Sequence, residues 1–195
     1  MDKTIISLFN IFMFDKHRRS IRLKKYNYSD AGWYFITICT QNRKCLLGNV
    51  INDKMVLNEF GKIVNKKINE LKIYRNVEID IYCVMPNHVH LILIIVGADP
   101  RVRPLLKNIG LSQNIDLGST QGSTPTIGEY VKRIKTLTTF IYINNVKNNN
   151  WPPFEKRLWQ RNYYEHIIRN EYLLNKIRQY IKDNPINWND DRNKF

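Results

Sequence analysis

The stretch VEIDIYCVMPNHVHLILIIV, residues 77–96, decides the fold. From Val77 to Met85 the residues alternate, which predicts a strand with one face made of Ile79, Ile81, Cys83 and Met85. Residues 88–96 are almost continuously apolar and predict a second strand. Pro86 has no amide proton for a sheet hydrogen bond, so we expect a turn or bulge between the two strands.

The segments on either side supply further strands and helices. β-branched and aromatic runs indicate strands, and apolar residues recurring every three or four positions indicate amphipathic helices. Caps strengthen two of the helix predictions, a Thr126–Glu129 capping box and Asn170 as an N-cap. The expected elements are a strand at 32–40, a hairpin at 46–57 around Asn52-Asp53, and helices at 58–72, 126–148 and 171–183. This order predicts the α+β class, an antiparallel sheet with helices packed on it.

The composition points to a nucleic-acid partner. The 195 residues include 31 Lys and Arg against 17 Asp and Glu, a net charge of +14. Such a surplus on one small domain is typical of nucleic-acid binding, with a generic basic surface or a ribosome-associated protein as the alternative. Three cysteines without metal-site spacing fit a reduced, cytoplasmic setting. The apolar stretch 5–14 is too short to span a bilayer, so no membrane partner is expected.

Changes in composition along the chain suggest how it is divided. We expect one main domain, residues 16–188, preceded by an extension at 1–15 and followed by a C-terminal tail at 189–195. Residues 97–126 are rich in Gly, Pro, Ser, Thr and Asn, which predicts a flexible loop inside that domain.

Two groups of residues suggest chemistry. His88 and His90 lie two apart in a strand, so both imidazoles project from one face, where they can bind one divalent metal ion or simply be hydrogen-bonded. Tyr180 and Asn184 are four apart near the end of the last helix and share a face. Asn184 offers a hard oxygen ligand, although packing and helix termination explain the same pair of residues.

Together these groups resemble a known site, that of the HUH single-tyrosine transposases of the IS200/IS605 type. Within that superfamily the chain looks most like the REP-associated tyrosine transposases, from about Arg18 to Trp188. The blocks that carry the resemblance are RRSIRLKKYNYSDAGWYFITICTQNR (18–43), VMPNHVHLIL (84–93), GADPRVRP (97–104) and LWQRNYYEHIIRNEYLLNKIRQYIKDNP (158–185). The resemblance implies a ferredoxin-like (RRM-like) sheet of the HUH endonuclease type.

The resemblance also implies a mechanism. His88, His90 and Asn184 match the metal ligands, for Mg²⁺ or Mn²⁺, and Tyr180 matches the nucleophile that cleaves single-stranded DNA through a 5′-phosphotyrosine. The family binds DNA hairpins, and candidate DNA-binding residues are Arg18, Arg19, Arg22, Lys24, Lys25, Lys132, Arg133, Lys135, Arg161, Tyr163 and Tyr164. Tyr163 and Tyr164 are also the alternative nucleophiles, and core packing explains them equally well.

Two other functions compete with a transposase. A non-catalytic hairpin-binding protein on the same fold would keep the basic surface without the chemistry. A relaxase or replication initiator also uses an HUH site, but the short His88-Val89-His90 pattern with a C-terminal tyrosine favours the transposase branch. The family includes monomers and homodimers that exchange the tyrosine helix, so Tyr180 is expected to act either within its own chain or on a partner.

Overall fold

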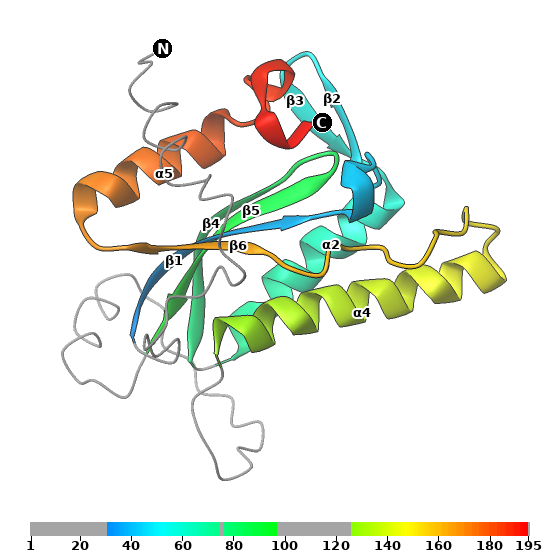
Figure 1. Ribbon diagram of the computed structural model, residues 1–195, viewed down its shortest axis with the longest axis horizontal. Helices are drawn as coiled ribbons and strands as arrows, with labels where there is room; N and C mark the ends of the chain where they lie inside the picture. The colour runs from blue at the N-terminus through cyan, green and yellow to red at the C-terminus, as the bar shows by residue number, and fades with distance from the viewer. Residues whose placement is uncertain (1–30, 75, 97–125, 195) are drawn as a thin grey trace, which may run out of the picture.

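The computed structural model describes residues 31–74, 76–96 and 126–194, and within them a four-stranded sheet carries helices on both faces (Figure 1). The extension at 1–15 and nearly all of the expected loop 97–126 lie outside the described residues. The elements are β1 (Gly32–Cys39), β2 (Gly48–Ile51), β3 (Lys54–Leu57), α2 (Glu59–Asn69), β4 (Val77–Val84), β5 (His88–Ile95), α4 (Ile127–Asn148), β6 (Tyr164–Ile168) and α5 (Glu171–Asp183). Short 3₁₀ turns η1 (Gln41–Arg43), η2 (Glu70–Ile73), η3 (Trp188–Asp190) and η4 (Arg192–Lys194) complete the chain.

The sheet has the ferredoxin-like topology expected from the sequence. The strands lie in the order β4-β5-β1-β6, and every neighbouring pair is antiparallel. With α2 between β1 and β4, and α4 between β5 and β6, the connectivity is βαββαβ. The β2–β3 hairpin forms a separate small sheet, and it turns at Asn52 and Asp53, both with positive φ. The α+β prediction is confirmed.

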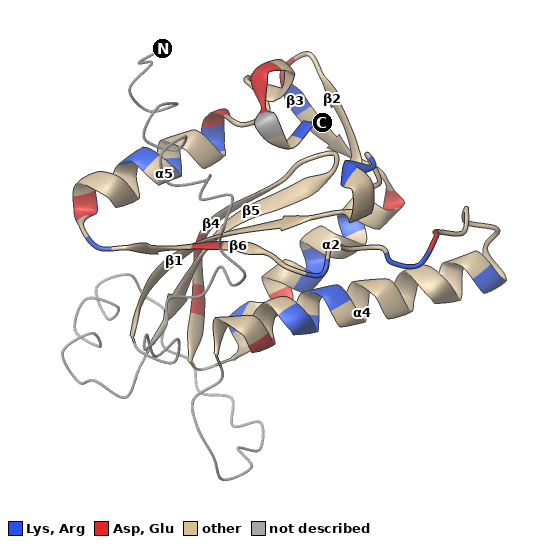
Figure 2. Ribbon diagram, viewed as in Figure 1, with Lys and Arg blue, Asp and Glu red and all other residues tan. Residues whose placement is uncertain are grey.

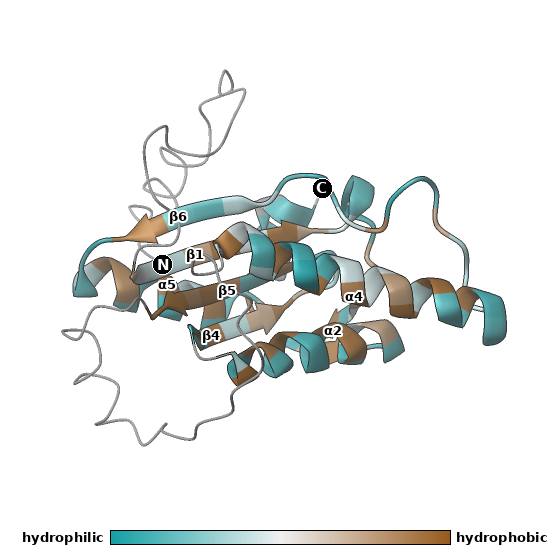
Figure 3. Cartoon of the chain, turned by 90° about the horizontal axis from the view of Figure 1, so that it is seen from below, coloured by the Kyte–Doolittle hydropathy of each residue, from teal (hydrophilic) through white to brown (hydrophobic). Residues whose placement is uncertain are grey.

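Alternation along β1 and β5 gives the sheet two different faces. Tyr34, Ile36 and Ile38 join Val89, Leu91 and Leu93 in the main core against α2 and α4. We call this side the α2–α4 face. The intervening residues, among them Phe35 and Ile92, pack against α5 on the opposite side, the α5 face. Figures 1 and 3 show α2 and α4 together on one side of the sheet, with α5 on the other in Figure 1.

A β-bulge in β4 overturns one detail of the sequence prediction. Ile79 pairs with Leu93 and Tyr82 with Leu91, so two residues of β4 oppose Ile92 alone. The bulge shifts the alternation by one residue, because the extra residue turns the rest of the strand over. Ile79 therefore packs in the main core, whereas Ile81 and Cys83 pack on the α5 face. The prediction that all four apolar residues share one face was wrong.

Helix α5 is fixed to the sheet by a cap, an apolar face and an ion pair. The Asn170 side chain accepts a hydrogen bond from the Leu173 amide at the first turn. Leu174, Ile177 and Ile181 are each no more than 1% exposed and pack against Phe35 and Ile92. In addition, the guanidinium of Arg178 donates to both carboxylate oxygens of Asp80 on β4, at 2.7 and 2.6 Å. These contacts hold α5 against the sheet of its own chain.

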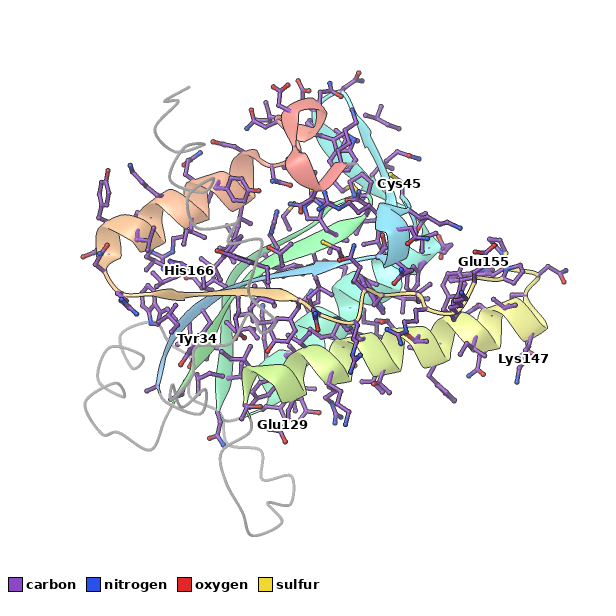
Figure 4. The ribbon with its side chains drawn as sticks, viewed as in Figure 1. Tyr34, Cys45, Glu129, Lys147, Glu155 and His166 are labelled. Carbon is purple, nitrogen blue, oxygen red and sulfur yellow. The ribbon has the colours of Figure 1, made fainter. Side chains whose placement is uncertain are left out.

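Strand β6 was not predicted from the sequence. It is only five residues long, contains Glu165 and His166, and lies at the edge of the sheet beside β1. Such a short, partly polar segment lacks the apolar run that marks a buried strand, and pairing with β1 determines its conformation. His166 is labelled in Figure 4.

Candidate metal and tyrosine site

The two histidines of β5 lie side by side on the α5 face. His88 is 0% and His90 1% exposed, and their ring centroids are 4.4 Å apart. Val89 between them points into the main core, as the alternation of a strand requires. The structure therefore brings the two imidazoles together in a buried layer between the sheet and α5.

A polar partner orients each imidazole through its Nδ1 atom. The Thr37 hydroxyl, directly opposite on β1, lies 2.8 Å from Nδ1 of His90. The side-chain oxygen of Asn87 lies 2.7 Å from Nδ1 of His88. Such hydrogen bonds fix the orientation of metal-binding histidines and leave Nε2 for the ion.

Tyr180 approaches this pair from α5. Its hydroxyl lies 3.2 Å from Nε2 of His90, and the two ring centroids are 5.2 Å apart. Phe35 packs edge-on against the Tyr180 ring and is stacked on His90. The phenol is thus held at the histidine pair by residues of the same chain.

Two further side chains place oxygen atoms near the histidines. Asn184, four residues after Tyr180, is 2% exposed, and its side chain is close enough to His88 to influence the pKa of that imidazole. The side chain of Asp191 is 3% exposed, and its Oδ2 lies 3.5 Å from Nε2 of His88. One ligand atom from each of His88, His90 and Asp191 lies within 4.8 Å of the others. Asp191 was missed because it falls in the segment expected to be a tail, and no spacing connects it to the histidines.

Three of these acceptor atoms are buried without a hydrogen-bond partner. They are Nε2 of His88, Oδ1 of Asn184 and Oδ2 of Asp191. Buried acceptors that face one another are costly unless a proton or a cation lies between them. The mixed nitrogen and oxygen donors fit a divalent cation such as Mn²⁺ or Mg²⁺.

Burial keeps both imidazoles of the site unprotonated. Burial lowers the pKa of His88 to about 4, although Asp191 and Asn184 act in the opposite direction. Burial, and then the neighbouring His88, lower the pKa of His90 well below its usual range. Both imidazoles are therefore neutral at pH 7, which is the form that binds metals.

Cys39 and Cys83 flank the histidines but are poor ligands. Cys83 is opposite His90 on β4, and Cys39 is opposite His88 on β1. Burial raises the pKa of Cys39, and burial, with Asp191, raises that of Cys83 to about 11. Neither thiol belongs to the group of candidate ligand atoms that His88, His90 and Asp191 form, so the donors of that group are nitrogen and oxygen.

The other two tyrosines of the sequence-based prediction are in different surroundings. Tyr163 packs on the main core, with the Lys135 ammonium 5.7 Å from its ring centroid. Tyr164 packs on the α5 face, edge-on to Phe35, and burial raises its pKa to about 12. A phenol with so high a pKa is hard to deprotonate, which disfavours Tyr164 as a nucleophile.

The predicted DNA-binding cations fall into three groups. Lys132 and Arg133 on α4 and Arg161 before β6 are exposed, and basic residues follow α4 and the segment after it (Figure 2). The Lys135 ammonium instead donates to the backbone carbonyls of residues 160, 161 and 162, at 2.9, 3.5 and 3.0 Å. The remaining candidates, Arg18, Arg19, Arg22, Lys24 and Lys25, lie outside the described residues.

Comparison with known proteins gives a relative in sequence and a relative in fold. It is 41% identical over 177 residues to an uncharacterized protein of Haemophilus influenzae, covering 90% of this chain and 92% of that one, so the two belong to one family. No family model matches. A solved structure of a REP-associated tyrosine transposase bound to a REP hairpin is similar at a TM-score of 0.55 and 20% identity, covering 86% of this chain and 74% of that one. The chain therefore shares the fold of that transposase. Among the described residues, no helix is long and apolar enough to cross a membrane.

Proposed function

We propose that the family formed by this chain and its Haemophilus influenzae relative consists of REP-associated tyrosine transposases, which cleave and rejoin single-stranded DNA at hairpins. The observation that carries the proposal is the meeting of the Tyr180 hydroxyl with His90, beside three buried acceptors that have no hydrogen-bond partner. The shared fold with a transposase bound to a REP hairpin supports the same function.

The proposed reaction is a transesterification. The Tyr180 oxygen forms a bond to the scissile phosphorus, the bond from phosphorus to the 3′ oxygen breaks, and the phenol proton is released while the leaving oxygen takes up a proton. The products are a 5′-phosphotyrosine and a free 3′-hydroxyl. Because the phosphoester is conserved, a second 3′-hydroxyl can reverse the step and join DNA without a nucleotide cofactor.

His88, His90, Asn184 and Asp191 would hold a divalent cation. When bound, such a cation neutralises charge on the phosphate and orients the backbone for in-line attack. Neutral imidazoles and an amide keep the negative charge of the ligands low, which suits an anionic substrate. The Tyr180 hydroxyl lies 3.2 Å from Nε2 of His90, the atom through which His90 would bind the cation.

The basic surface supplies the substrate contacts. Lys132, Arg133 and Arg161 are exposed on the described part of the chain, and each phosphate contact would steepen the salt dependence of DNA binding. Tyr163 and Tyr164 remain candidates for base stacking at their partly exposed edges. We expect hairpin DNA with a single-stranded flank as the partner.

The test is covalent capture on a denaturing gel. Protein is mixed with hairpin DNA from sequence flanking its gene, labelled 3′ of the expected nick, with and without Mn²⁺. We expect a shifted band that requires the cation, persists in Tyr164→Phe and disappears in Tyr180→Phe, while both variants still bind the hairpin within a few-fold. A band that is lost in Tyr164→Phe and kept in Tyr180→Phe would show that Tyr164, and not Tyr180, is the nucleophile. Tight binding without any band would favour the non-catalytic hairpin binder.

A further inference from the structure

Asn87, directly before the histidine pair, is a buried amide that is hydrogen-bonded at both ends of its side chain. It is 0% exposed and lies in the turn between β4 and β5. Its nitrogen donates to the backbone carbonyl oxygens of Arg43 and Asn193, at 3.1 and 2.5 Å, and lies 3.4 Å from that of Lys194. Its backbone carbonyl also accepts hydrogen bonds from the amide and hydroxyl of Thr40. These contacts leave the side chain a single orientation.

That orientation determines the protonation of His88. A flipped amide would place its oxygen against three carbonyl oxygens, so the nitrogen must face them and the oxygen must face His88. Because the Asn87 oxygen can only accept, Nδ1 of His88 must carry the proton. Its Nε2 is then an unprotonated acceptor, in agreement with its lack of a donor partner.

The Asn87 amide is also connected to Asp191 by two hydrogen bonds that meet at Asn193. The Asn193 carbonyl accepts from Asn87, and the Asn193 amide donates to Oδ1 of Asp191 at 2.7 Å. Oδ1 is thereby occupied, and Oδ2, which has no partner, is directed at Nε2 of His88. One side chain therefore sets the direction of two acceptors on segments about one hundred residues apart.

We propose that Asn87 is a positioning residue that aims His88 and Asp191 at a shared divalent cation, and that the C-terminal turns η3 and η4 are part of the metal site. The inference rests on the proposed function for the presence of a cation. The inference adds Asp191 as a ligand to the predicted metal site, and it adds Asn87 as a residue that acts on the cation only through His88 and Asp191. It follows that the last residues of the chain are needed for metal affinity as well as for packing.

The test combines metal binding with a direct measurement of the histidine tautomer. Free Mn²⁺ is followed by electron paramagnetic resonance during titration of the full-length chain and of Asn87→Ala, Asp191→Asn and the double variant. Asn69→Ala is the matched control, because its amide is bonded to Asn65 and Tyr82 beside α2, away from the site. Long-range nitrogen–proton NMR spectra of the metal-free protein show which nitrogen of His88 carries the proton.

We expect one Mn²⁺ per chain, a 10- to 100-fold weaker affinity in Asn87→Ala, and unchanged affinity in Asn69→Ala. The double variant should lose less than the product of the two single losses, because both changes act on Asp191. His88 should be protonated at Nδ1 in the native chain, a result that needs no variant. Protonation at Nε2, or native affinity in Asn87→Ala, would overturn the inference. A native chain that binds no Mn²⁺ would instead overturn the proposed cation centre itself.

Discussion

Acid should destabilise the metal-free protein through His88. Its pKa is about 4 in the folded chain, against an ordinary value of 6.5, because the folded state buries the imidazole. The unfolded chain therefore binds the proton more tightly than the folded one. The free energy of unfolding is therefore unaffected by His88 above pH 6.5, and it decreases as the pH falls from 6.5 toward 4.

The size of the effect follows from the two pKa values. At pH 5 almost every unfolded chain carries the proton and few folded ones do, which costs about 2 kcal/mol of unfolding free energy. Below pH 4 the loss reaches its limit of about 3 kcal/mol. His88 is fully buried, so solvent screening reduces this value little.

Urea unfolding at pH 7.5 and pH 5.0, in the presence of a chelator, measures this loss. The matched variant is His88→Gln, which cannot ionise. His90 is present in both proteins, and burial, the larger cause of its lowered pKa, acts in both, so most of the difference between them comes from His88. We expect the native chain to lose about 2 kcal/mol more than the variant between the two pH values. Equal losses would refute the reasoning, because they would mean that His88 titrates normally in the folded chain.

Two further predictions concern the tyrosine helix and the DNA surface. Arg178→Leu removes the ion pair with Asp80 and should lower the unfolding free energy by about 1 kcal/mol, since Arg178 is one-third exposed. Covalent-adduct formation should slow with it, and an unchanged adduct rate would show that apolar packing alone positions Tyr180. Lys132→Ala should reduce the salt dependence of hairpin binding by about one unit of slope, whereas Lys135→Met should leave it unchanged, because the Lys135 ammonium is bonded to backbone carbonyls. Equal slopes for the two variants in a salt titration would contradict this assignment.

The sequence was sufficient for elements whose signal is local. The capping box at Thr126 is present, and α5 has the predicted bounds, Glu171 to Asp183, because its cap and its apolar spacing lie within the helix itself. The antiparallel hairpin at Asn52-Asp53 is likewise confirmed, since those two residues tolerate the left-handed backbone that the turn needs.

Features that depend on distant partners could not be predicted in this way. The bulge at residues 80–81 places Asp80 opposite Arg178, almost one hundred residues later, and nothing near Asp80 in the sequence indicates it. Strand β6 exists because β1 offers it an edge. Asp191 reaches His88 only through the folded turns around Asn193, which no periodicity describes.

The sheet and its main core come before helix α5 in the chain, and this order affects truncated forms of the protein. The main core and all four strands of the sheet are complete once β6 has been synthesised, whereas Tyr180, Asn184 and Asp191 all follow it. A chain that ends before α5 therefore lacks the proposed nucleophile, and it exposes the apolar surface of Phe35 and Ile92 that α5 normally covers. An exposed apolar patch of this kind favours aggregation and degradation, so the helix that brings Tyr180 to the histidines also protects the folded sheet.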